Sequence, residues 1–205
     1  MINYPKPATK QCTEKILDQM TNSIYKINEK RDKFDICIFS HIKNQNMNIP
    51  VMLTNYETIN EKYLSKNDGI KVTINNKIKK IKFGNVKYLN KALGLSVIEV
   101  KENNEISFLE LDDNLYEKEH EIYYNKESIY IFGNDKEHEI SVSYGLINNV
   151  IKSEIIYSSY LDFNNRIFTP IFNLSNNKVI GIFKKSGICY NHGIILKDII
   201  NEFIY

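Results

Sequence analysis

The chain of 205 residues lacks the features that mark several classes of protein. Its three cysteines, Cys12, Cys37 and Cys189, cannot all pair, and none has the spacing of a metal clip. No apolar stretch reaches the ~20 residues that span a membrane, and the opening MINYPKPATKQ lacks the apolar core of a signal peptide. We therefore expect a cytoplasmic protein with reduced thiols, no metal site, no cofactor and no contact with a membrane.

Charge of one sign is also missing. The net charge is +2, from 27 basic and 25 acidic residues mixed along the chain, so the electrostatic footprint of a nucleic-acid-binding protein is absent. The run KIKKIKF at 77–83 interleaves lysine with isoleucine, which favours a strand with one solvated face over a ligand patch. We expect no nucleic-acid partner.

The remaining pattern is mostly β. Short apolar or alternating runs, many of them separated by Asn, Asp, Gly or Lys clusters, favour a sandwich or barrel. In order they read SIYKI, FDICIFSHI, IPVMLT, IKVTI, KIKKIKF, LSVIEV, SIYIFG, EISVSYGLI, RIFTPIF, KVIGIF and HGIIL. A helical pattern precedes them, with Ile16, Leu17 and Met20 on one face and Thr13 as a candidate cap. A second helical pattern, LKDIINEFIY, lies at the C-terminal end of the sequence.

Four segments carry a resemblance to a known family. KILDQMTNSIYKI at 15–27 is followed by PVMLTNYETIN, then GLSVIEV, then NRIFTPIFNLSNNKVIGI. In this order they resemble trypsin-like serine proteases of the chymotrypsin fold, particularly the intracellular type, from about residue 13 to 204. The resemblance implies two six-stranded antiparallel barrels with an N-terminal and a C-terminal helix packed outside. The expected segments are an N-terminal extension and helix at 1–22, a barrel at 23–112, a linker at 113–128, and a second barrel with the terminal helix at 129–205.

The same resemblance implies that the catalytic triad is substituted. The histidine position holds Glu57, the aspartate position holds Gly94 and the serine position holds Ile167. Serine hydrolysis needs a hydroxyl activated by a base that a carboxylate orients, and none of these residues fits its role. Phe168 and Thr169 stand where a glycine-rich turn would form the oxyanion hole. We therefore expect no triad proteolysis.

The resulting hypothesis is a pseudoprotease that binds a protein or peptide partner, with the remnant of the cleft between the barrels as one candidate place. In active relatives an extended peptide pairs with the strand edge that corresponds to GIFKKSG, and such main-chain pairing needs no triad. The candidate edge residues are Gly181, Ile182, Phe183, Lys184 and Lys185. An equally good reading is that the two lysines keep an exposed edge soluble.

Three alternatives stay open at this point. Cys189 precedes His192 by three residues, which suggests a relocated cysteine hydrolase, although a buried structural cysteine is the commoner explanation. A nuclease-type activity of His, Tyr and Lys on the same scaffold is another. A structural or assembly protein is the third, and the sequence reveals neither the partner nor the oligomeric state.

Overall fold

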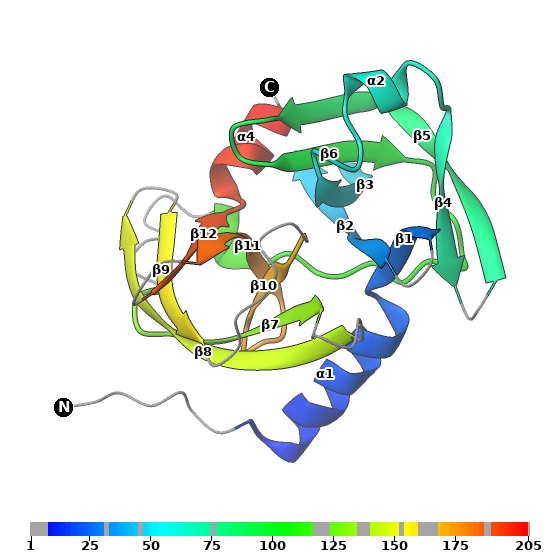
Figure 1. The fold of residues 1–205 in the computed structure, drawn as a ribbon. Helices are drawn as coiled ribbons and strands as arrows, with labels where there is room; N and C mark the ends of the chain where they lie inside the picture. The colour runs from blue at the N-terminus through cyan, green and yellow to red at the C-terminus, as the bar shows by residue number, and fades with distance from the viewer. Residues whose placement is uncertain are drawn as a thin grey trace. The chain divides into compact units, whose positions relative to one another are not determined.

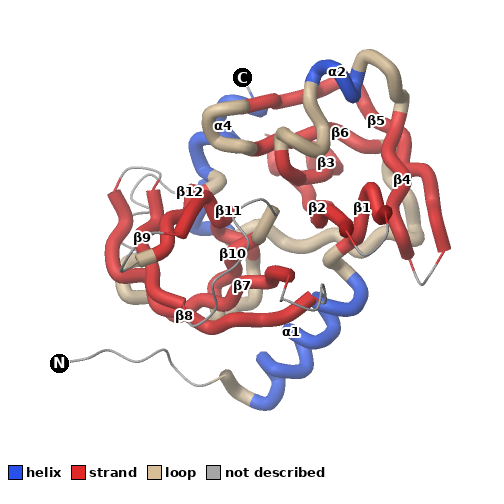
Figure 2. The backbone as a smooth tube through the Cα atoms, in the orientation of Figure 1, coloured by secondary structure: helices blue, strands red, loops and turns tan. Residues whose placement is uncertain are grey.

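The computed structural model describes residues 8–30, 33–44, 47–74, 77–116, 124–134, 140–151, 154–159, 168–186 and 190–204. The chain divides into two compact units, one of Gln19–Glu110 with Ile200–Tyr205 and one of Met1–Asp18 with Leu111–Ile199. Each unit contains a closed six-stranded antiparallel barrel (Figure 1). Strands dominate the backbone and the helices are few (Figure 2). The expected fold class, an all-β double barrel of the chymotrypsin type with a helix near each end of the chain, is confirmed.

The first barrel has the strand order β1-β2-β3-β6-β5-β4. Its strands are β1 (Tyr25–Lys30), β2 (Lys33–Asn44), β3 (Met47–Asn55), β4 (Gly69–Ile74), β5 (Lys77–Asn90) and β6 (Leu95–Val100), with the short helix α2 (Glu61–Leu64) between β3 and β4. Alternate apolar residues of these strands fill the interior, where Tyr25 and Phe39 pack edge to face with ring centroids 5.2 Å apart. The Tyr25 hydroxyl accepts the Ser107 N–H at 2.7 Å, so the buried polar end of this ring is satisfied.

The second barrel has the strand order β10-β11-β12-β9-β8-β7. Its strands are β7 (Ser128–Asn134), β8 (Ile140–Ile151), β9 (Glu154–Ser159), β10 (Pro170–Asn173), β11 (Val179–Ser186) and β12 (Asn191–Ile195). The sequence pattern missed β9. In this strand Ile155 and Tyr157 are buried, and Ile156 between them is half-buried. Because all three residues are apolar, the sequence shows no alternation of apolar and polar residues that would predict a strand.

The N-terminal helix α1 (Lys10–Asn22) forms where it was expected, but with a different start and a different buried face. Thr9, not Thr13, caps it, because the Thr9 hydroxyl accepts the Cys12 N–H at 3.2 Å. Thr13 lies inside the helix and donates to the Thr9 carbonyl oxygen at 3.1 Å. The predicted cap was therefore one turn too late.

The buried face of α1 is made by Cys12, Ile16 and Gln19, which recur at helical spacing. Leu17, which the sequence placed on this face, is 51% exposed. The Cys12 thiol lies 3.1 Å from the Asn177 side-chain oxygen, and both residues belong to the unit that contains the second barrel. The helix α4 (Lys197–Ile204) buries Ile199 and Ile200, as its pattern indicated.

The polar stretch predicted as a linker is partly core. Leu115, in the short 3-10 helix Asp113–Tyr116, is buried, and so is Tyr124. Burial and the nearby Asp112 carboxylate raise the pKa of Tyr124 well above its usual range. Residues 117–123 lie outside the described part. The described flanks of this stretch thus pack into the unit of the second barrel rather than only connecting two bodies.

In the described ranges no helix has both the length and the apolar character needed to cross a membrane. Cys12 and Cys37 are free thiols, and Cys189 lies outside the described residues.

The Cys37 thiol is fully buried in the first barrel, and this burial raises its pKa well above the usual range. Because alkylation requires an accessible thiolate, we expect Cys37 to resist iodoacetamide in the native protein and to react rapidly in denaturant. Peptide mapping by mass spectrometry measures this. Equal rates of Cys37 labelling with and without denaturant would contradict the prediction.

Candidate functional site

Glu57 and Gly94, two of the three positions that the resemblance assigns to the triad, lie in neighbouring turns of the first barrel. Strand β3 ends at Asn55 and β6 begins at Leu95, and these two residues are paired. One residue further, the Tyr56 N–H donates to the Gly94 carbonyl oxygen at 2.9 Å. Glu57 follows directly. The structure therefore brings Glu57 and Gly94 to the same end of the same strand pair, as the resemblance implies for a base and the carboxylate that orients it.

The side chains at these positions cannot play those roles. Glu57 is exposed, and its N–H donates to the Asn55 side-chain oxygen at 2.9 Å, which closes a local turn. Gly94 has no side chain to orient a base. The buried Thr54 hydroxyl donates to the Ile36 carbonyl oxygen at 2.9 Å and fastens the strand that leads into the turn. The two turns are thus held in place by main-chain and side-chain hydrogen bonds, and neither position carries the residue type that the resemblance requires there.

Gly94 has a conformational reason to be glycine. Its φ is +68°, in the left-handed region, and a Cβ placed there would meet no atom within 4 Å. We expect Gly94→Ala to lower the free energy of unfolding by about 1 kcal/mol because of backbone strain alone. Gly94→Asn should lower the free energy of unfolding by less, since asparagine tolerates this conformation. Urea unfolding of both variants checks the order, and an alanine variant as stable as the parent would contradict it.

Ile167, the third position that the resemblance assigns to the triad, lies outside the described residues. The two residues after it are described: Phe168 is buried, and so is Thr169. The Thr169 carbonyl oxygen accepts the Phe183 N–H at 2.8 Å, which joins this segment to β11 just before β10 begins.

The five candidate edge residues of β11 fall into two groups. Gly181, Ile182 and Phe183 have main-chain partners on both sides, in β12 and in β10 or the residue before it. Lys184 is the extra residue of a β-bulge, and beyond it Lys185 and Ser186 pair with β12 alone. The part of the chain that the structure describes places no strand on the other side of residues 184–186. We call this segment the open side of β11.

A buried carboxylate holds the polar turn between β10 and β11. Asp112 is almost completely buried, and its Oδ2 accepts the side-chain amides of Asn173 at 3.3 Å and Asn176 at 3.0 Å. Its Oδ1 accepts the Asn114 N–H at 3.0 Å. Sequence reasoning placed Asp112 at the end of the first barrel and saw no role for it. Its two side-chain partners, Asn173 and Asn176, are more than 60 residues away, so no local pattern could reveal these contacts.

The histidine of the alternative cysteine site is also described. His192 lies on β12, and its Nδ1 is 3.0 Å from the Oε1 of Glu154 on the neighbouring strand β9. A carboxylate at this distance fixes the orientation of an imidazole ring. Cys189 lies outside the described residues.

Within the described ranges, no group of three or more His, Cys, Asp or Glu side chains converges as a metal site would require. A comparison with protein-family models finds no match, and a search of curated proteins finds no relative. A functional assignment therefore depends on the geometry of the barrels and on the resemblance of the four sequence segments.

Proposed function

We propose that this protein is a non-catalytic, trypsin-like double-barrel protein, a pseudoprotease, that binds an extended segment of a protein or peptide. The binding place is the open side of β11, residues 184–186. One observation carries the proposal: among the described residues, β11 has main-chain partners on both sides up to Phe183 and on one side only from Lys184 to Ser186.

Addition of a strand at such a place requires little beyond the backbone. The incoming segment would use main-chain hydrogen bonds for affinity and alternate side chains for specificity. The closed barrel behind residues 184–186 holds the segment in place through its pairing with β12. Neither a base nor a nucleophile takes part, so the substitutions at Glu57 and Gly94 leave binding intact.

A photo-crosslinking experiment tests the binding place. A photoreactive residue replaces Lys184, which is exposed on the bulge, and the protein is illuminated with a pool of random peptides. The matched control carries the same residue at Lys15, which is exposed on α1. The proposal predicts crosslinked peptides at position 184 and a much weaker signal at position 15. Equal yields at the two positions would refute it.

A second candidate function is a cysteine hydrolase at Cys189 and His192. The contact that favours it is the one between His192 and Glu154, because a base held by a carboxylate is what activates a thiol. An electrophilic cysteine probe separates the two functions. If the probe labels Cys189, and His192→Ala abolishes this labelling while Glu57→Ala preserves it, the protein is a cysteine hydrolase and not a pseudoprotease. If Cys189 is not labelled, the cysteine-hydrolase function is excluded.

A further inference from the structure

The β4–β5 hairpin has an edge that the barrel does not use. Strand β6 ends at Val100, which pairs with Phe83 of β5, whereas β5 begins six residues earlier at Lys77. Residues 77–81 therefore pair with β4 on one side, and none of the described segments pairs with their other side. We call residues 77–81 the open edge of β5. Figure 1 shows this end of β5 beside β4 at the margin of its barrel.

The hydrogen-bond pattern identifies the unused main-chain groups. The Phe83 N–H donates to the Asp68 carbonyl oxygen and so points toward β4, while the Lys82 carbonyl oxygen accepts the Lys101 N–H on the opposite side. Neighbouring residues of an antiparallel strand alternate in this respect. Ile78 and Lys80 therefore direct their N–H and C=O groups away from β4, and in the described part of the chain nothing pairs with them.

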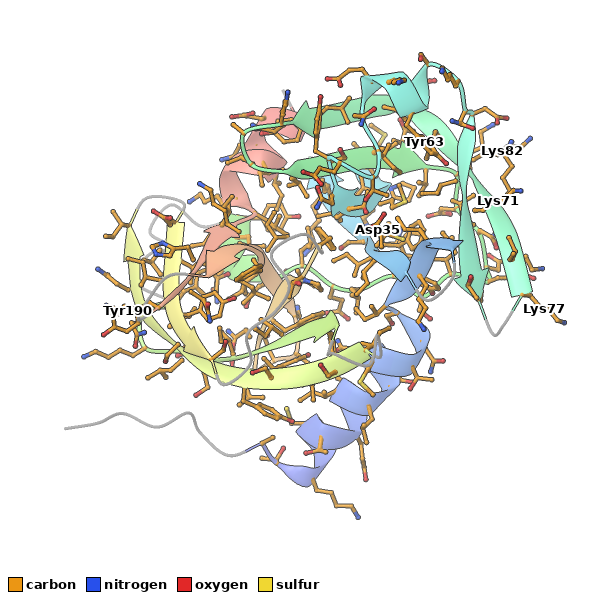
Figure 3. All side chains as sticks on the ribbon, viewed as in Figure 1. Asp35, Tyr63, Lys71, Lys77, Lys82 and Tyr190 are labelled. Atoms are coloured by element: carbon orange, nitrogen blue, oxygen red, sulfur yellow. The ribbon has the colours of Figure 1, made fainter. Side chains whose placement is uncertain are left out.

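The side chains beside this edge are cationic. Lys71, Lys77 and Lys82 form no ion pair with any described residue, and Figure 3 shows them along the two strands of the hairpin. Lys80 is paired with Asp68 at 2.5 Å, and this contact, with a smaller contribution from Lys82, holds the pKa of Asp68 below its usual value. Lys79 is paired with Glu105 at 3.0 Å, so two of the five lysines between residues 71 and 82 have a carboxylate partner.

An exposed isoleucine completes the surface. Ile78 is 71% exposed, and its cross-strand partner is Thr73. Because successive side chains of a strand point to opposite faces of the sheet, Ile78 lies on the same face as Lys80 and Lys82. The face thus combines an apolar contact with positive charge next to unpaired main-chain groups.

We propose that the open edge of β5 is a second binding place, which takes up an extended acidic segment of a partner protein as an added strand. The unpaired N–H and C=O groups of Ile78 and Lys80 provide the ladder, the lysines attract carboxylates, and Ile78 receives an apolar side chain. A second copy of this chain is disfavoured, because edge-to-edge pairing would set lysine against lysine. The site lies in the other unit from the open side of β11 and does not depend on it.

The probe is a short fluorescent peptide of alternating glutamate and valine, with binding measured by fluorescence anisotropy on the full chain. Lys80→Gln and Lys80→Pro form a matched pair, because both remove the charge and only proline removes the N–H that points away from β4. We expect Lys80→Gln to weaken binding about threefold. Lys80→Pro should weaken it about tenfold further, the equivalent of one hydrogen bond. Lys15→Gln, an exposed position on α1 in the other unit, should leave the affinity unchanged.

The same peptide with N-methyl groups on alternate residues tests strand addition even if the proline variant does not fold. It keeps the charge and loses the donors on one edge, so the proposal predicts that its binding is lost. Equal affinity of Lys80→Gln and Lys80→Pro, or of the plain and methylated peptides, would overturn strand addition. Tighter binding to phosphatidylserine vesicles or to duplex DNA than to the peptide, or concentration-dependent dimers in light scattering, would overturn the acidic peptide as occupant.

Discussion

Replacement of Asp112 by alanine is expected to lower the free energy of unfolding by about 3 kcal/mol, because it leaves buried donors without an acceptor. The Asp112 carboxylate is the shared acceptor for Asn173, Asn176 and the Asn114 N–H. Its loss would loosen the turn that leads from β10 into β11. Urea denaturation followed by circular dichroism measures the change.

The adjacent Asp113 is the matched control. Its side chain is 60% exposed and pairs with Lys178 at 2.6 Å. An exposed ion pair of this kind contributes little to stability, so Asp113→Ala should lower the free energy of unfolding by less than about 1 kcal/mol. Asp112→Asn, which keeps an acceptor oxygen, should fall between the two. Similar losses for Asp112→Ala and Asp113→Ala would show that the buried network does not stabilise the turn.

The second large effect is expected in the aromatic cluster of the second barrel. Phe172 is fully buried, its ring stacks on Tyr130 at 4.8 Å, and it meets Phe132 edge to face at 5.1 Å. Phe172→Ala should cost about 3–5 kcal/mol, because the cavity it leaves is lined by rigid rings. Thermal unfolding measures the loss.

The control for this variant is Ile151→Ala, in which an isoleucine that is 51% exposed is truncated. Because little apolar area leaves the core there, its stability should change by less than about 1 kcal/mol. A loss for Ile151→Ala as large as that for Phe172→Ala would mean that the cluster is not the core of this barrel.

Most of the strands could be predicted from the sequence because their apolar residues form short runs with polar neighbours. IPVMLT and LSVIEV are examples: residues 51–54 of the first are buried, and so are residues 95–98 of the second. Strand β9 could not be found in this way, since Ile156, one of its three apolar residues, lies on the less buried face and hides the alternation. The buried face of α1 was misplaced for a related reason, because Cys12 and Gln19 are not read as apolar anchors.

The lysine-rich run at 77–83 contains a shift in its alternation that separates its two isoleucines. In KIKKIKF the alternation shifts its phase between Lys79 and Lys80, so Ile78 and Ile81 cannot share a face of the strand. Ile81 is buried and Ile78 is exposed. The prediction of a strand with one solvated face is confirmed, because residues 78, 80 and 82 are exposed and Ile81 is buried. The solvated face carries Ile78 beside the lysines. The unpaired main chain beside it depends on where β6 ends, which the run itself does not contain.

The candidate site was only partly within reach of the sequence. The resemblance of separate segments predicted that Glu57 and Gly94 occupy corresponding places, and the structure sets their turns side by side. The five edge candidates were chosen from one strand, without knowledge of its neighbours. In the described part of the chain, pairing with β12 and with residues 169–171 uses the main chain of residues 181–183, and the open side is confined to residues 184–186.

The most direct test of the central claim is to incubate the purified protein with a random peptide library and to analyse both the retained and the released peptides by mass spectrometry. Binding without catalysis predicts that the retained peptides are intact and that no cleavage products accumulate. Turnover of the library that is lost when Glu57 or Ile167 is substituted would contradict the claim, as would a protein that retains no peptide at all.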